Sequence, residues 1–348
     1  MRKLGFFLSL TLFALAQASG TRVTLYPAFA EIAEPVRIEH GVFVWQPGER
    51  VAAQRVEDLV WMTGVEVQRR VWRKGALWVF AHGDRGVLHH LTRGLSGSVR
   101  YALEVEKEQL AAWLRVRNAL DTPIEVEELR FISGPVPLAE GPRLPRAKAM
   151  ARAAPTEEGA FSGSGGGVFR YRLSGPLLLE PEVTELPLFA LPVRPAFYWR
   201  YRGPFQKGER LFFRRGYRFQ APKPLAAGTL DLFYGGDFLG RVRVPETYAG
   251  EQVELALGPA TRARSKRRVE VLQETPELAR YRVTTTVENP SEEAVEVEIE
   301  ETFHADAVEL ELPEGERRPG GYRIHFSLPP GGERTYRFEV TLRYKKRP

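Results

Sequence analysis

Cysteine is absent from the 348 residues of this chain. Disulfides, thiolate metal ligands, cysteine nucleophiles and a lipid anchor attached to cysteine are therefore excluded. Asparagine occurs only twice, and lysine nine times against 41 arginines. Few thermolabile amides and many charges are typical of heat-adapted proteins, so the composition predicts a thermophile protein.

Long apolar runs are absent after the first twenty residues. The chain begins with Met-Arg-Lys, continues with an apolar run over 4–15, and has the small-x-small pattern Ala-Gln-Ala at 16–18. This pattern predicts a secretory signal peptide over 1–18, with an uncleaved membrane anchor as the alternative. No later segment approaches about 18 consecutive apolar residues, so we expect no transmembrane span after cleavage. The expected location is secreted, in the periplasm or cell envelope, where nucleic acid is not a partner.

Helical periodicity is scarce, and apolar and polar residues alternate instead. The clearest alternating segments are 280–288, 295–300, 322–328 and 336–344. The segment Pro-Pro-Gly-Gly at 329–332 is a turn signal between the last two of these. Only 56–62 has a pattern that suits a short turn or helix. The sequence therefore predicts an all-β fold.

The two asparagines occupy corresponding places in the sequence. Asn118 and Asn289 each end an alternating segment, and a second alternating segment begins six residues later in both cases. An asparagine side chain can bond to the backbone of a turn and tolerates the left-handed region. The repeat predicts two related sandwich-like modules, with coincidence as the alternative.

A break in composition divides the chain. Residues 141–167 have low hydrophobicity and end in a Gly/Ser-rich run, so we expect a flexible insert there. The expected domains are the signal peptide at 1–18, an N-terminal β region at 19–95, a middle β-sandwich at 96–226 that contains the insert, and a C-terminal β-sandwich at 227–348.

Several segments resemble one known family. The most specific are 228–240 (GTLDLFYGGDFLG), 249–258 (AGEQVELALG), 287–290 (VENP) and 327–333 (SLPPGGE). Weaker similarity extends upstream over 21–27, 118–134 and 169–173. The segments are similar to the mucoidy-inhibitor-A-like proteins, whose C-terminal part is a domain of unknown function. The resemblance implies β-sandwich architecture, which we take to be immunoglobulin-like, and an envelope association, but no catalytic motif. Longer family members carry a central coiled coil, for which this chain has no heptad run.

Candidate catalytic and metal-binding groups are few. Ser96 lies in Gly-Leu-Ser-Gly-Ser, which departs from the G-x-S-x-G nucleophile elbow at its last position. His89 and His90 are adjacent and would point to opposite faces of a strand; His82 and Asp84 are the nearest other ligand types. We expect no metal, no cofactor and no enzymatic activity.

A row of carboxylates offers the alternative of an enzymatic function. Glu296, Glu298 and Glu300 share one face of an expected strand, where paired carboxylates could hydrolyse a glycan. In a hairpin closed at Asn289, however, the same face would carry Arg280 and Arg282 and form cross-strand ion pairs. We favour the ion pairs and keep a glycan-active hydrolase as the alternative function.

The candidate partner-binding residues come from two segments. Trp199 and Tyr201 belong to the densest aromatic stretch and could form a binding platform, although such a face is more often core. Arg264 and Arg267 belong to a basic run at 262–268, which suits either an anionic partner or a charged edge strand that resists aggregation. We expect an exported cell-envelope binding or structural protein that acts on an envelope protein or an anionic polymer through β-sandwich surfaces.

Overall fold

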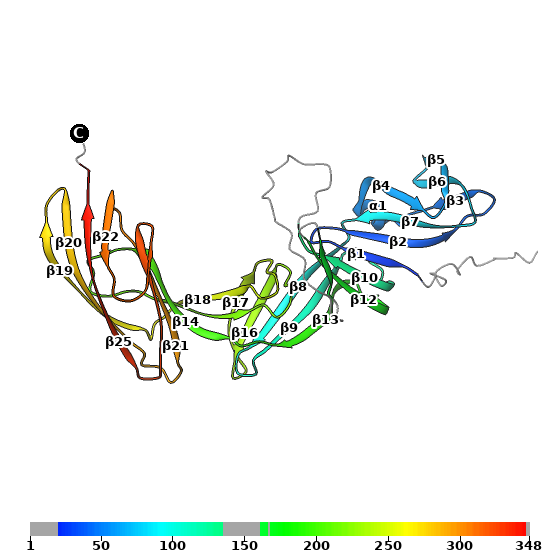
Figure 1. Ribbon diagram of the computed structural model, residues 1–348. Coiled ribbons are helices and arrows are strands. Elements are labelled where there is room, and N and C mark those ends of the chain that lie inside the picture. The colour runs from blue at the N-terminus through cyan, green and yellow to red at the C-terminus, as the bar shows by residue number, and fades with distance from the viewer. Residues whose placement is uncertain (1–19, 135–160, 166–167, 346–348) are drawn as a thin grey trace, which may run out of the picture. The chain divides into compact units, whose positions relative to one another are not determined.

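A computed structural model describes residues 20–134, 161–165 and 168–345 (Figure 1). Within these ranges the chain is almost entirely β, with one helix, α1 (Glu49–Gln54), which confirms the all-β prediction. None of the described segments forms a helix long and apolar enough to cross a membrane. The predicted signal peptide and most of the predicted insert lie outside the described residues.

The described chain forms two compact units. Unit 1 comprises the described parts of 20–101, 111–190 and 226–228, and unit 2 comprises 102–110, 191–225 and 229–345. The division falls inside β8 (Leu95–Glu104), β9 (Gln109–Asn118) and β13 (Glu182–Pro192). The units are therefore interleaved along the chain and do not follow one another as consecutive segments.

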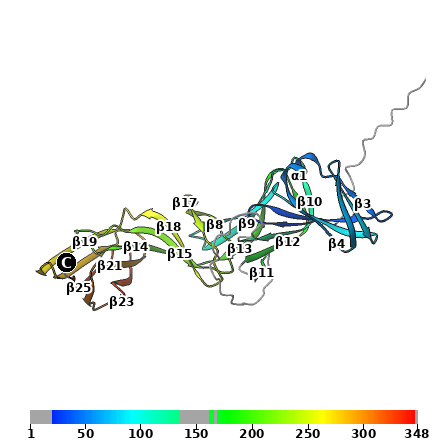
Figure 2. The ribbon, with the colours of Figure 1, turned by 90° about the horizontal axis from the view of Figure 1, so that it is seen from above.

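Unit 1 contains a seven-stranded sheet with the order β11-β12-β10-β1-β2-β7-β4 and a three-stranded sheet with the order β3-β6-β5. The strands of the larger sheet are β1 (Arg22–Leu25), β2 (Ala30–Arg37), β4 (Arg55–Thr63), β7 (Arg85–Thr92), β10 (Ile124–Ile132), β11 (Phe161–Gly165) and β12 (Val168–Leu179). Those of the smaller sheet are β3 (Val42–Trp45), β5 (Glu66–Arg73) and β6 (Ala76–His82). In Figures 1 and 2, β3 lies at the same end of unit 1 as β4.

Two predictions for unit 1 were wrong. Residues 56–62 lie in strand β4, and the helix α1 ends one residue before that strand begins. Residues 162–165, expected in a flexible insert, lie in β11, which pairs with β12. In both places pairing with a neighbouring strand overrides the local pattern.

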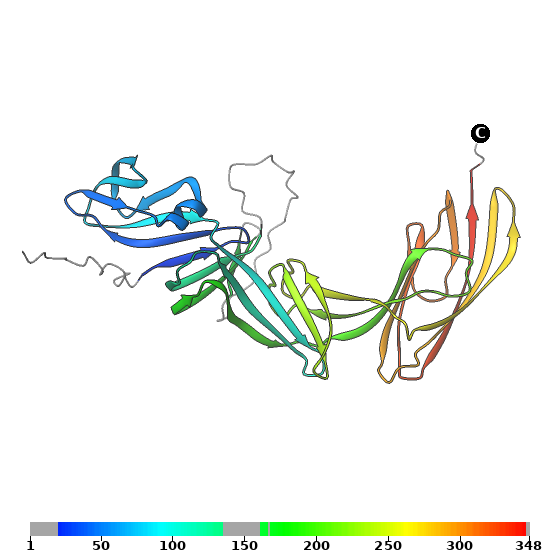
Figure 3. The ribbon, with the colours of Figure 1, turned by 180° about the vertical axis from the view of Figure 1, so that it is seen from behind.

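Two sheets of unit 2 share one core (Figure 3). The first has the order β18-β15-β14-β21-β24-β23 and the second β19-β20-β25-β22. The strands are β14 (Ala196–Pro204), β15 (Arg214–Gln220), β18 (Gln252–Pro259), β19 (Arg264–Glu274), β20 (Leu278–Glu288), β21 (Val295–Thr302), β22 (Ala307–Glu311), β23 (Glu316–Arg318), β24 (Gly321–Leu328) and β25 (Glu333–Arg343). The remaining strands of the chain are β16 (Gly228–Tyr234) and β17 (Asp237–Val244).

Alternation builds the core of unit 2, because every second side chain of a strand points to the same face. Val297 and Phe326 enter the core from one sheet, and Tyr281 and Phe338 enter it from the other. The predicted alternating segments at 280–288, 295–300, 322–328 and 336–344 all lie in strands, which confirms them.

The two units repeat one strand arrangement. In unit 1 the order β11-β12-β10-β1-β2-β7 corresponds, strand by strand and in chain order, to β23-β24-β21-β14-β15-β18 in unit 2. The directions agree as well, since β1 runs parallel to β10 and β14 runs parallel to β21. The orders β13-β9-β8 and β25-β20-β19 correspond in the same way. This correspondence supports the prediction of two related modules.

Both asparagines form the same corner at equivalent places. Oδ1 of Asn118 accepts from the amide of Leu120, and its Nδ2 donates to the carbonyls of Thr122 and Leu179. Oδ1 of Asn289 accepts from the amide two residues on, and its Nδ2 donates to the carbonyls of Glu293, Leu328 and Pro329. Each side chain therefore ties the end of one strand to the turn that follows and to a strand of the other sheet.

These corners correct the predicted hairpin. β20 pairs with β19 and β25, whereas β21 pairs with β14 and β24, so the chain changes sheet at Asn289 instead of folding back on itself. Arg280 and Arg282 accordingly pair with Glu339 of β25, at 2.9 Å and 2.7 Å. The glutamates of β21 lie in the other sheet and have other partners.

Replacing Asn289 with alanine is expected to destabilise unit 2 by about 1–3 kcal/mol, since buried carbonyls and an amide lose their partner. Asn289 is 1% exposed, so water does not replace the lost bonds. Urea unfolding of the full chain measures this loss. Glu292→Ala changes an exposed residue of the same turn and serves as the control; equal effects of the two substitutions would contradict the role given to the asparagine.

Candidate functional site

The predicted aromatic platform faces the interior of unit 2. Trp199 is 2% exposed and belongs to the core, and Tyr201 packs against that core. Their neighbours Arg200 and Arg202 lie on the opposite face of β14, where they bind glutamates. Trp199 is therefore a core residue, and Tyr201 is a partly buried residue that packs against the same core.

The two predicted basic residues are separated by the alternation of β19. Arg264 is exposed, whereas the side chain of Arg267 is fully buried and binds both carboxylate oxygens of Glu301, at 2.7 Å and 2.8 Å. The hydroxyl of Tyr322 donates to the same carboxylate. Arg267 is thus part of an internal ion pair, and of these two residues only Arg264 faces solvent.

The predicted glutamate row lies on the outer face of the six-stranded sheet. Glu298 contacts Arg200 at 3.0 Å and Arg323 at 3.1 Å. Burial favours a higher pKa for Glu298, but hydrogen bonds and charge from these arginines outweigh it and lower the pKa. Glu300 binds Arg202 at 2.9 Å, and Glu296 lies 3.9 Å from Arg218, so the row is an ion-pair network with arginines of β14, β15 and β24 instead of Arg280 and Arg282.

The histidines of β7 have separate surroundings. His89 Nδ1 lies 2.8 Å from Glu31 Oε1, and its Nε2 lies 2.8 Å from Thr63 Oγ1. A hydroxyl, an imidazole and a carboxylate in series are also found in hydrolases. Here they lie on three adjacent strands, and Trp61 stacks on the imidazole ring at 4.9 Å. Among the described residues no group of three or more His, Asp or Glu side chains is placed to hold a metal ion.

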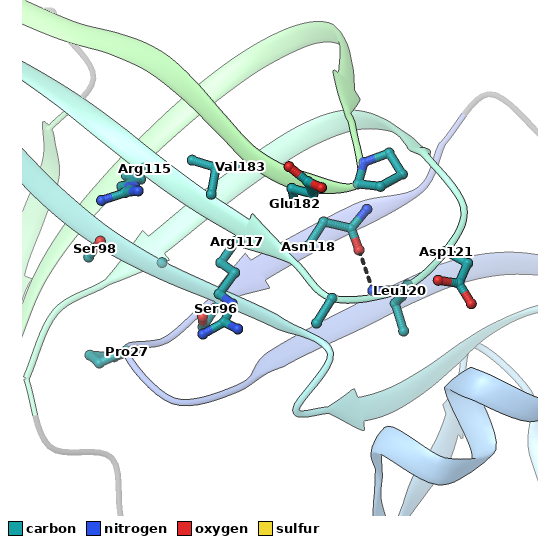
Figure 4. Close-up of a pocket in the computed structure, with 13 residues that line it drawn as sticks. Pro27, Ser96, Ser98, Arg115, Arg117, Asn118, Leu120, Asp121, Glu182 and Val183 are labelled. Carbon is teal, nitrogen blue, oxygen red and sulfur yellow. Dashed lines mark hydrogen bonds between the residues drawn. The ribbon is translucent and has the colours of Figure 1, made fainter.

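A polar pocket of about 850 Å³ lies in unit 1 (Figure 4). Its walls come from the loop after β1, the start of β8, the end of β9 and the β12–β13 turn. The lining residues are Pro27, Ser96, Gly97, Ser98, Arg115, Arg117, Asn118, Ala119, Leu120, Asp121, Pro181, Glu182 and Val183.

Alternation places the polar side chains of the pocket. On β9, Val116 is buried, whereas its neighbours Arg115 and Arg117 are exposed. On β8, Ser96 and Ser98 likewise alternate with buried residues. Two guanidinium groups and two hydroxyls therefore line one pocket, and all four can donate hydrogen bonds.

The Asn118 corner shapes this pocket but has no spare hydrogen-bond donor. Its Oδ1 accepts from the amide of Leu120 at 2.9 Å (Figure 4). Both hydrogens of its Nδ2 go to backbone carbonyls, at 3.1 Å and 3.0 Å. Asn118 therefore positions the end of β9 and leaves ligand contacts to the arginines and serines.

Two tight positions fix the pocket walls. A Cβ on Gly97 would lie 2.7 Å from the ring of Phe131, so only glycine lets β8 approach this closely. Glu182 has a φ of 76°, a left-handed conformation that a residue with a side chain rarely adopts. Such strain is retained when the surroundings determine the local conformation, and it is common at functional sites.

The electrostatics of the pocket favour an anion near β9. Arg115 lies 3.9 Å from Glu185, at the limit of an ion pair, and Arg117 forms no ion pair with any carboxylate in the described ranges. Glu182 and Asp121 also line the pocket, on the turns that follow β12 and β9. No histidine and no aromatic residue lines it. The arrangement suits recognition of a carboxylate or phosphate group by arginine and hydroxyl donors.

Sequence reasoning identified only two residues of this pocket. The sequence marks Asn118 as a turn former and Ser96 as a serine in an imperfect G-x-S-x-G motif. It does not mark Arg115, Arg117 or Glu182 as site residues. The alternation of 109–118 places Arg115 and Arg117 on the outer face of one strand, which is the signal that was available. The other walls of the pocket depend on which strands become neighbours in the sheets, and a local sequence pattern does not reveal strand pairing.

Comparison with known proteins does not assign the chain: no family model and no curated protein matches its sequence.

Proposed function

We propose that this protein is an exported cell-envelope protein that binds an anionic polymer through the unit 1 pocket. The observation that carries the proposal is the presence of Arg115 and Arg117 on one strand face beside Ser96 and Ser98, in a pocket of about 850 Å³. A guanidinium can bind two oxygens of one phosphate or carboxylate, and a hydroxyl can donate to a third. The pocket therefore suits one anionic group of a chain together with the units on either side of it.

The framework of this proposal comes from the sequence. We propose that residues 1–18 direct export and that the two related units are immunoglobulin-like β-sandwiches. A relationship to the mucoidy-inhibitor-A-like proteins is part of the same proposal and would agree with an envelope location. The shared core of the two sheets in unit 2 and the repeated strand order support this reading of the fold.

Replacing Arg117 with glutamine is expected to weaken binding of an anionic oligomer by about tenfold to a hundredfold, since a hydrogen bond to a charged group contributes about 1.5–3 kcal/mol. Calorimetric titration of the full chain measures this effect. The probes are a glycerol-phosphate oligomer and an oligogalacturonate, which carry phosphate and carboxylate respectively. Arg243→Gln, at an exposed position of unit 2, is the matched control and should leave the affinity unchanged.

Two results would contradict the proposal: failure of the wild-type chain to bind either oligomer, or equal affinities of the Arg117 and Arg243 variants. A glycan hydrolase is the second candidate, because Asp121 and Glu182 line the same pocket. The variant Glu182→Gln separates the two. Binding of an anion should be unchanged or stronger once a negative charge is removed, whereas hydrolysis of a glycan by this pair would be abolished.

A further inference from the structure

The three-stranded sheet of unit 1 has one face in the core and one face in solvent. The inner face contributes Leu77, Val79 and Ala81 to a buried cluster with strands of the larger sheet. The opposite face carries the residues between these positions, since side chains alternate along a strand. This outer face does not take part in the pocket described above.

The outer face is apolar across all three strands. Val44 on β3 lies opposite Trp78 on β6, which lies opposite Val71 on β5. The next row runs from Val42 to Phe80. Val44 is 41% exposed and Trp78 is 37% exposed. An exposed cluster of this kind, formed by strand neighbours, is typical of a surface that binds a partner.

Positive charge borders this apolar face on β5 and at the β5–β6 turn. The guanidinium of Arg69 lies over the ring of Phe80 at 4.4 Å. Arg70, in contrast, lies opposite the buried Val79 and donates to the carbonyl of Val60 on the inner side. Arg73 and Lys74 are exposed at the β5–β6 turn.

Trp78 is the tryptophan of the outer face. Trp45 and Trp72 both lie opposite Leu77, so they share the inner face, where Trp72 is 45% exposed at the edge of the sheet. Tryptophan is enriched where proteins meet the interface between lipid and water, because its ring is apolar and its N–H is polar.

We propose that the outer face of the β3–β6–β5 sheet binds the surface of an anionic lipid bilayer. Trp78, Phe80 and Val44 enter the headgroup region, and Arg69, Arg73 and Lys74 face the anionic headgroups. Arg69, Arg73 and Lys74 outnumber Glu66, the one acidic residue on the outer face of these three strands, which favours a negatively charged partner; the apolar rows require one that also offers hydrocarbon. A lipid surface offers both, whereas a soluble anionic polymer offers only charge.

Sedimentation of the full chain with lipid vesicles tests this proposal. Vesicles of phosphatidylglycerol mixed with phosphatidylcholine should bind the chain, vesicles of phosphatidylcholine alone should bind it much less, and added salt should weaken binding. The double substitution Arg73→Gln and Lys74→Gln is expected to weaken binding about thirtyfold, since each basic residue near such a surface contributes about a factor of five. Trp78→Ser is expected to weaken it about tenfold through lost apolar burial.

The controls separate this surface from the pocket and from general stickiness. Phe212 is 82% exposed in unit 2, so Phe212→Ser should leave vesicle binding unchanged. Arg117→Gln should leave it unchanged too, and therefore failure of this proposal is distinguishable from failure of the pocket proposal. The inference is overturned if the folded wild-type chain does not bind anionic vesicles. It is also overturned if the Trp78 and Arg73/Lys74 variants bind as well as wild type, as they would if the face serves a protein partner.

Discussion

Replacing Glu301 with alanine is expected to destabilise unit 2 by about 3–5 kcal/mol, the cost typical of breaking a buried ion pair. The side chains of Arg267 and Glu301 are both 0% exposed, and two hydrogen bonds join them. Without the carboxylate, the buried guanidinium of Arg267 loses both hydrogen bonds and keeps its contact with the face of the Phe205 ring, at 5.1 Å. The hydroxyl of Tyr322 loses its acceptor at the same time.

Two controls identify burial as the cause. The exposed pair of Arg280 with Glu339 offers the same chemistry at the surface, so Arg280→Ala should cost less than about 1 kcal/mol. The double variant Arg267→Met with Glu301→Leu replaces both charges by apolar groups and should recover most of the loss. Urea unfolding with hydrogen exchange at β19 and β21 measures all three. An effect of Glu301→Ala no larger than that of Arg280→Ala would contradict the buried pair.

Lowering the pH from 7 to 4 is expected to remove about 3 kcal/mol of stability through His90 alone. Burial, and then the charges of Arg55 and His89, lower the pKa of His90 from 6.5 to about 4. Between these two pH values the unfolded chain holds a proton on this residue that the folded chain does not. The contribution of His90 to stability is therefore nearly complete at pH 7, falls as the pH is lowered from 6.5 toward 4, and levels off once the pH is well below 4.

The substitution His90→Leu isolates this effect. His90 is 2% exposed, and neither ring nitrogen has a hydrogen-bond partner among the described residues, so leucine removes no bond. Urea unfolding at several pH values should show a much flatter profile between pH 6.5 and 4 for this variant than for wild type. His304→Gln changes an exposed histidine and should keep the wild-type profile. A wild-type slope in the His90 variant would contradict the assignment.

The sequence predicts where strands lie better than it predicts which strands pair. Alternation identifies β20, β21, β24 and β25 because burial of one face is a local property of a strand. The predicted pairing of β20 with β21 was wrong, because the chain changes sheet at Asn289. There the side-chain amide of Asn289 donates to the carbonyl of Leu328. That bond joins residues far apart in sequence, so the local pattern does not reveal it.

Runs of charged or aromatic residues predicted the binding residues less reliably than alternation predicted the strands. The basic run at 262–268 suggested one exposed patch, yet alternation along β19 turns Arg267 into the core, where Glu301 neutralises it. The aromatic stretch misled in the same way, because Trp199 packs against the second sheet of unit 2. Conversely, the sequence around Arg115 and Arg117 does not predict a pocket. The other walls of the pocket come from β8 and the β12–β13 turn, and that turn is distant in sequence from the two arginines.

Hydrogen exchange of the full chain with and without a glycerol-phosphate oligomer shows whether the unit 1 pocket binds an anionic polymer. We expect slower exchange at 95–98 and 115–121, which contribute the serines and arginines of the pocket, and no change at 262–268, which contain the exposed Arg264. Protection confined to 262–268, or unchanged exchange throughout the chain at saturating oligomer, would contradict polymer binding at this pocket.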